Sequence, residues 1–198
     1  MEAKSSHCDI WYVRSITVFL LFLLGFQLMS CMPVIKLVYG IHKPRYVSDS
    51  AVVKYYNRLG LQGEIYRLKD YNSGNRKKFR YLGNTMPDVL LFNSKGYLTK
   101  FDIDCSKGLD SIVKLSLHDI DSMSLEGKSI QDFIDDTYVI NNLNNKEIHH
   151  LNMPLYVVKF ADYAGKLNKE NVPALIAQLN LRSDIHYVIL NMDYSVPE

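Results

Sequence analysis

The chain has 198 residues, of which 47% are hydrophobic and 22% charged, with a formal net charge of +2 at pH 7. This length allows one domain of ordinary size or two small ones, and the hydrophobic content excludes a globally disordered chain. A charge so close to zero excludes the broad basic surface on which nucleic-acid binding depends. The strongest basic cluster, NRKKFR at residues 75–80, is better explained as the solvated face of a helix.

The N-terminal region contains an apolar stretch at residues 16–29, ITVFLLFLLGFQLM, which Lys4 and Arg14 precede. A membrane-spanning helix needs roughly 20 apolar residues. The shorter stretch found here is typical of the hydrophobic region of a secretory signal peptide, with the basic residues at its start. The alternative is an uncleaved anchor helix over residues 11–38, which Arg14, Gln27 and Pro33 disfavour.

Residues 28–31, Leu-Met-Ser-Cys, resemble the lipobox of bacterial lipoproteins. This resemblance implies cleavage before Cys31 and attachment of a lipid to its thiol, although Met29 is larger than the usual residue at its position. Such an anchor would hold the protein at the cell membrane without a span. No Asp follows Cys31, which favours the periplasmic side of the outer membrane. The predicted division is a signal peptide over residues 1–30, a tether over 31–47 and a folded domain over 48–198.

The folded domain is predicted to mix helices and strands. Ser48 or Asp49 is expected to cap the first helix, and Gly96 to supply the positive φ of a hairpin turn at residues 93–96. Near the C-terminus, two apolar strands separated by a helix predict a parallel crossover in an α/β sheet. The predicted elements, in chain order, are a helix at 50–60, a strand at 64–70, a short helix within 72–84, strands at 89–92 and 97–103, helices at 109–120 and 129–142, a strand at 155–161, a helix at 168–180 and a strand at 185–193.

The C-terminal part of this pattern, residues 156–193, resembles the core unit of thioredoxin-fold proteins. Phe160 and Ala161 end a strand that leads into a helix, and the following strand ends in Asn-Met-Asp at residues 191–193. In that family, the helix begins with the redox tetrad Cys-Gly-Pro-Cys. In this chain the tetrad positions correspond to Ala164, Gly165, Lys166 and Leu167. Thiol–disulfide exchange needs two sulfur atoms, so the resemblance implies a domain without that chemistry.

A second stretch, residues 85–101, resembles the thioredoxin hairpin that follows a proline, usually cis; Pro87 corresponds to that proline. The two pieces occur in reverse order, which leaves open one rearranged domain or two partial units at residues 48–120 and 150–198. We therefore expect an α/β fold with a thioredoxin-like mixed sheet and flanking helices, preceded by a signal or anchor helix. The chain is also similar to small lipoproteins of Bacteroidetes-type bacteria, through YGIHKP and GKLNKENV, and that similarity implies no activity.

These resemblances imply a redox-inactive binding or assembly module, lipid-anchored in the cell envelope, whose partner is another envelope protein. An enzyme and a cofactor are not expected. The alternative is a thiol oxidoreductase or peroxidase using Cys105, although the neighbouring Asp102 and Asp104 would raise the pKa of its thiol.

No metal site is predicted, because the pair at residues 149–150 (His-His) lacks further ligands and Asp132 and Asp136 are better explained as a solvated helix face than as a calcium site. Most of the tyrosines between residues 55 and 194 are expected to pack within the fold rather than to form a binding surface.

Overall fold

The computed structural model describes residues 32–82, 88–101, 110–141, 148 and 152–196, and a compact unit runs from residue 39 to residue 198. Among these described residues, none of the helices has the length and apolar character needed to cross a membrane. The predictions for Cys31, Pro87, Cys105 and the histidine pair at 149–150 lie outside the described residues.

The elements alternate between helix and strand along most of the chain. The helices are α2 (Met32–Tyr39), α3 (Asp49–Arg58), η1 (Arg76–Leu82), α4 (Asp110–Val113), α5 (Leu117–Ser122), α6 (Ile130–Asp136), η3 (Asp162–Ala164) and α7 (Lys166–Leu179). The strands are β1 (Tyr46–Val47), β2 (Ile65–Leu68), β3 (Asp88–Phe92), β4 (Tyr97–Thr99), β5 (Leu125–Ser129), β6 (Thr137–Asn141), β7 (Leu155–Phe160), β8 (His186–Asn191) and β9 (Tyr194–Ser195).

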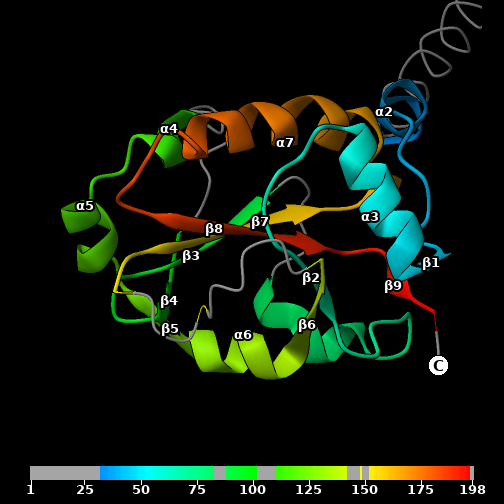
Figure 1. Cartoon of the computed structure of the whole chain (residues 1–198). Helices are drawn as coiled ribbons and strands as arrows, with labels where there is room; N and C mark the ends of the chain where they lie inside the picture. The colour runs from blue at the N-terminus through cyan, green and yellow to red at the C-terminus, as the bar shows by residue number, and fades with distance from the viewer. Residues whose placement is uncertain (1–31, 83–87, 102–109, 142–147, 149–151, 197–198) are drawn as a thin grey trace, which may run out of the picture. The chain divides into compact units, whose positions relative to one another are not determined.

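Seven of these strands form one mixed sheet in the order β5-β4-β3-β7-β8-β2-β6 (Figure 1). The three strands β7, β8 and β2 are parallel, and every other neighbouring pair is antiparallel. Strands β1 and β9 form a separate two-stranded parallel sheet. The predicted α/β class and the parallel crossover β7–α7–β8 are therefore confirmed.

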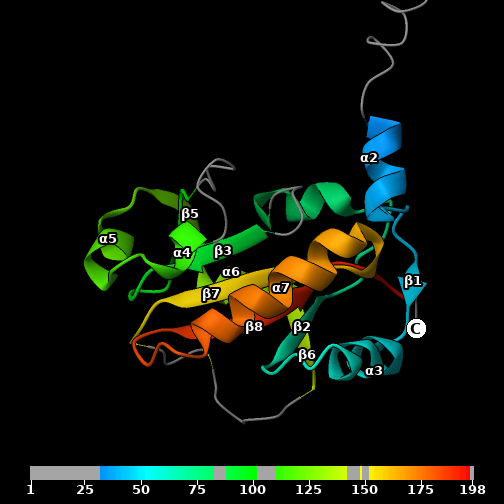
Figure 2. The same cartoon turned by 90° about the horizontal axis from the view of Figure 1, so that it is seen from above.

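Helices cover both faces of the sheet, so its central strands are buried on both sides (Figures 1 and 2). On one face, α3, α4 and α7 pack over a core that includes Val52, Ile112 and Ile176. On the other face, η1 and α6 contribute Phe79 and Phe133 to a second core. All six residues of β7 are buried, which explains its nearly continuous apolar sequence.

Local sequence signals account for several of the elements. The Ser48 hydroxyl caps α3 by accepting from the Ala51 N–H at 3.4 Å, as predicted. The β3–β4 hairpin is confirmed, and Gly96 has a φ of +80° in its turn. Residues 76–80 of the basic cluster lie in η1, where Lys77, Lys78 and Arg80 are exposed, as expected for a solvated face.

Two predicted helices are wrong in part. The helix expected at 129–142 ends at Asp136, because the β-branched and aromatic run from Thr137 forms β6 and pairs antiparallel with β2. Within the helix expected at 109–120, the described residues form α4 and α5 as separate helices. Ser116 begins α5 by forming a capping box with Asp119.

Tyrosine side chains supply much of the core, as the sequence indicated. Five of them are less than 9% exposed: Tyr56, Tyr66, Tyr71, Tyr156 and Tyr194. The Tyr56 and Phe160 rings have centroids 4.8 Å apart and are inclined by 57°, and this tilted arrangement joins α3 to β7.

Burial of tyrosine predicts a loss of stability at alkaline pH. It raises the pKa of Tyr56 and Tyr66 above the ordinary value near 10, so the folded state retains phenolic protons that the unfolded chain releases. The stabilisation is complete below about pH 10 and is lost as the pH rises through the folded-state pKa values. Denaturant titrations between about pH 8 and 12 should show this fall. The fall in unfolding free energy with pH should be shallower in Tyr56→Phe than in wild type. The control Tyr97→Phe should behave like wild type, because Tyr97 is 47% exposed. If Tyr56→Phe loses stability with pH as steeply as wild type, the explanation is contradicted.

A candidate binding cavity

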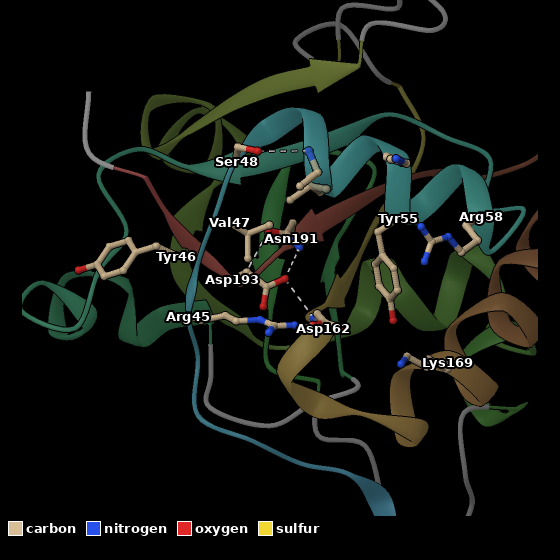
Figure 3. A pocket seen from close by; sticks show the side chains of 13 residues that line it. Arg45, Tyr46, Val47, Ser48, Tyr55, Arg58, Asp162, Lys169, Asn191 and Asp193 are labelled. Atoms are coloured by element: carbon tan, nitrogen blue, oxygen red, sulfur yellow. Dashed lines mark hydrogen bonds and ion pairs between the residues drawn. The ribbon is translucent and has the colours of Figure 1, made fainter.

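A cavity of about 660 Å³ lies beside the carboxyl ends of the parallel strands. The strand register aligns Phe160 of β7 with Asn191 of β8, and Asn191 with Arg67 of β2, so these strands end at one edge of the sheet. Ligands of open α/β sheets commonly bind in a crevice at this edge. Helix α3 and the segment just before it supply most of the lining. The rest comes from the end of β8 and the residues after it, from η3 and from α7 (Figure 3).

One face of α3 forms a wall of the cavity. Ala51, Lys54, Tyr55 and Arg58 all line it, and their spacing is that of neighbouring positions on one side of a helix. An adjoining side of α3 buries Val52 and Tyr56 in the core, and Val52 also borders the cavity. The helix is therefore fixed by its apolar side and presents a basic and aromatic side to the cavity.

Asn191 and Asp193 are 1% and 3% exposed as whole residues, and both line the cavity. The Asp193 Oδ2 accepts from the Asp162 backbone N–H at 3.1 Å and from the Asn191 side-chain amide at 2.9 Å. Burial raises the pKa of Asp193, whereas these two donors lower it. Its Oδ1 is buried without a hydrogen bond of good geometry in the described part of the chain. A buried acid of this kind is a feature of functional sites.

The Asp162 carboxylate, which begins η3, is paired before any ligand arrives. Arg45 donates to its Oδ2 from Nη2 at 2.6 Å, and His42 Nε2 lies 3.6 Å from the same oxygen. The side chain of Arg45 is 65% exposed, so this ion pair lies at the surface of the cavity (Figure 3).

The Tyr55 side chain extends from α3 towards Lys169 of α7 (Figure 3). Burial, followed by the charge of Asp162, raises the pKa of Tyr55 to about 12, so the phenol is neutral at physiological pH. The Lys169 ammonium lies 5.7 Å from the Tyr55 ring centroid and contributes a cation–π contact (Figure 3). A ligand in the cavity would therefore meet an aromatic ring with a cation over it.

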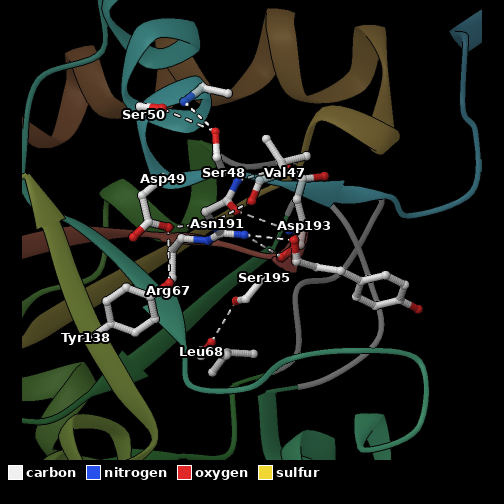
Figure 4. Close-up of polar contacts among 12 residues, drawn as sticks. Val47, Ser48, Asp49, Ser50, Arg67, Leu68, Tyr138, Asn191, Asp193 and Ser195 are labelled. Atoms are coloured by element: carbon white, nitrogen blue, oxygen red, sulfur yellow. Dashed lines mark hydrogen bonds and ion pairs between the residues drawn. The ribbon is translucent and has the colours of Figure 1, made fainter. Parts of the chain in front are cut away.

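The buried guanidinium of Arg67 ties several cavity-lining segments together (Figure 4). Its Nη1 donates to the Val47 carbonyl at 2.9 Å and to the Asp49 carboxylate. Its Nη2 donates to the carbonyls of Asp193 and Tyr194 at 3.3 and 2.9 Å. The strand β2 thereby fixes the start of α3 and the segment after β8, which both contribute to the cavity.

Of the tetrad positions, Ala164, Gly165 and Lys166 are not among the residues that line this cavity. Ala164 ends η3, Gly165 precedes α7, and Lys166 and Leu167 begin that helix. Asn191 and Asp193 are predicted from the sequence as a strand-ending motif, but the basic residues are not. The signal available for them was the spacing of Lys54 and Arg58 on α3, which also describes an ordinary solvated face.

The acidic pair considered for calcium is divided between two networks. Asp132 accepts from the backbone and hydroxyl of Ser129, whereas Asp136 pairs with Lys78 at 2.8 Å and accepts from the Tyr81 hydroxyl. Within the described ranges, no group of three or more His, Cys, Asp or Glu residues is arranged to hold a metal ion.

Comparisons with known proteins add no functional assignment. A scan against protein-family models gave no match, and searches of curated proteins and of solved structures gave no significant match. The fold and the cavity define the chain as an α/β protein with a seven-stranded mixed sheet and a basic pocket at the carboxyl ends of its parallel strands.

Proposed function

We propose that the chain is a lipid-anchored protein of the cell envelope whose folded unit is a redox-inactive, thioredoxin-like binding or assembly module for another envelope protein. The observation that carries the proposal is the start of α7, where the resemblance locates a redox tetrad. Ala164 and Gly165 are buried there, and the sequence from Ala164 to Leu167 contains no thiol.

The backbone of the chain itself covers this position. A Cβ added to Gly165 would collide with the carbonyl oxygens of Tyr39 and Gly40, and Gly165 has a φ of +61°. The His42 N–H also donates to the Tyr163 carbonyl at 3.0 Å. The backbone at Gly165 is therefore covered, and with no thiol at these positions a binding role is favoured over exchange chemistry.

The arrangement of the two resembling pieces supports the thioredoxin-like part of the proposal. The β3–β4 hairpin and the β7–α7–β8 crossover come from distant parts of the sequence but are adjacent in one sheet. Their contact favours one rearranged domain over two partial units.

Metabolic labelling with a fatty-acid analogue tests the anchor. We expect label on the wild-type protein and a complete loss in Cys31→Ser, because the thiol is the proposed attachment point. Two matched controls are Cys8→Ser, inside the proposed leader, and Cys105→Ser; both should keep the label. Protein that retains residues 1–30 and carries no label would contradict the anchor and support the uncleaved helix.

A photo-crosslinking residue tests the binding role. At Tyr46, which lines the cavity and is 51% exposed, it should give one discrete adduct with an envelope protein. At Leu181, which is 86% exposed and just beyond α7, it should give none. Insulin-disulfide reduction by the purified protein would instead contradict the redox-inactive assignment.

A further inference from the structure

The cavity at the carboxyl ends of β7 and β8 carries more positive than negative charge. Its volume, about 660 Å³, lies within the range typical of small-molecule sites. Four basic side chains and two carboxylates line it: Arg45, Lys54, Arg58, Lys169, Asp162 and Asp193.

The two carboxylates already have partners within the protein. Asp162 pairs with Arg45 at 2.6 Å, and one oxygen of Asp193 accepts two hydrogen bonds while the other is shielded from solvent. Neither carboxylate forms an ion pair with the remaining cations. Lys54, Arg58 and Lys169 thus have no carboxylate partner in the part of the chain that the structure describes.

Three cations without a carboxylate partner among the described residues line one cavity, and their like charges repel one another. Lys54 and Arg58 are four residues apart on the same helix, where like charges are destabilising. Lys169 approaches from α7 and is oriented over Tyr55 (Figure 3). An anion in the cavity would remove this repulsion and gain charge-assisted hydrogen bonds, of which the Arg58 guanidinium can donate two in parallel.

We propose that the cavity binds a small organic dianion, of the phosphomonoester or dicarboxylate class. Its charged groups would contact Lys54, Arg58 and Lys169, and its uncharged part would lie against Tyr55. This assignment goes beyond the proposed function, because it gives the module a small-molecule ligand independent of any protein partner. A long polyanion is disfavoured, because the chain as a whole has a net charge of only +2.

Isothermal titration calorimetry on the full-length protein in detergent tests the proposal. The probes are glycerol 3-phosphate, succinate, lactate and glycerol, which separate a phosphate dianion, a dicarboxylate, a monoanion and a neutral polyol. We expect one-to-one binding of at least one dianion, at least tenfold tighter than lactate, and no binding of glycerol. Preference for glycerol 3-phosphate would identify the phosphomonoester class, and preference for succinate the dicarboxylate class.

Two double variants with the same change in charge separate the cavity from the bulk charge. Arg58→Gln/Lys169→Gln should weaken dianion binding at least tenfold, whereas Lys77→Gln/Lys114→Gln, at exposed positions outside the cavity, should change it less than twofold. Thermal unfolding of each variant checks that it is folded. The proposal is overturned if neither dianion binds, if both double variants weaken binding equally, or if an acidic peptide binds more tightly than both dianions.

Discussion

Arg67→Ala should lower the free energy of unfolding by about 3–5 kcal/mol, the cost typical of removing one partner from a buried charged network. Arg67 is 1% exposed, and its guanidinium donates to three backbone carbonyls and to Asp49. Alanine leaves these carbonyls without their donor and leaves a cavity between β2 and β9. Urea titrations of wild type and variant measure this loss, provided that the unfolding free energy depends on urea concentration with the same slope in both.

Arg182→Ala is the matched control. Arg182 also uses its guanidinium fork, donating to the carbonyls of Val113 and Leu115 and pairing with Asp184, but its side chain is 16% exposed. Water can replace part of its contacts, so we expect a loss of about 1–2 kcal/mol. Arg67→Lys should fall between wild type and Arg67→Ala, because one ammonium cannot reproduce the fork. If Arg67→Ala lowers the unfolding free energy no more than Arg182→Ala, Arg67 does not hold these segments together as proposed.

Loss of Arg67 should also be visible locally. The Tyr194 N–H donates to the Arg45 carbonyl at 3.1 Å, in the two-stranded sheet that the guanidinium holds against β2. Hydrogen exchange at Tyr194 should therefore accelerate more in Arg67→Ala than exchange at Val157 in the central strand β7. Equal acceleration at both amides would indicate global destabilisation only.

The central part of the fold could be predicted because its sequence signals are local. The apolar runs that form β7 and β8, with a helix between them, specify a parallel crossover without reference to the rest of the chain. The turn around Gly96 likewise specifies the β3–β4 hairpin.

The edges of the sheet could not be predicted in the same way. Thr137 follows α6 without a Gly or Pro, so the helical spacing of the preceding residues extends into β6. The strand propensity of the run from Thr137 is realised through pairing with β2. Strand β5 contains Glu126, Gly127 and Lys128, which have little strand propensity, and it depends on pairing with β4.

The basic lining of the cavity could not be predicted from the sequence for a related reason. Lys54 and Arg58 on α3 have the spacing of a solvated face, and Lys169 belongs to another helix far along the chain. The sheet brings α3 and α7 to one face, and only this packing makes the three charges neighbours. The sequence predicted Asn191 and Asp193 as the end of a strand, whereas their place in the cavity and its basic wall required the tertiary structure.

Lys159→Met should destabilise the protein by about 3–5 kcal/mol, although it replaces a polar residue in a buried strand by an apolar one of similar length. Lys159 is fully buried in β7, directly opposite Asp88 on β3, and its ammonium donates to the Asp88 carboxylate and the Leu82 carbonyl. The single substitution leaves both acceptors without this donor. The double variant Lys159→Met/Asp88→Leu removes the charged pair together, so most of the lost stability should return.

The pH dependence of the same pair provides an independent check. Burial lowers the pKa of Lys159, and Asp88 opposes that shift. A lysine with a lowered folded-state pKa binds fewer protons in the folded than in the unfolded state, so its contribution to stability rises with pH between the folded pKa and about 10.5. Asp88→Asn removes the group that raises the pKa of Lys159, so the folded-state pKa should fall further and the pH range of rising stability should widen. The variant should therefore be less stable than wild type at neutral pH, and this difference in unfolding free energy should shrink as the pH increases towards 10. A deficit independent of pH would show that the ammonium does not depend on Asp88 for its charge.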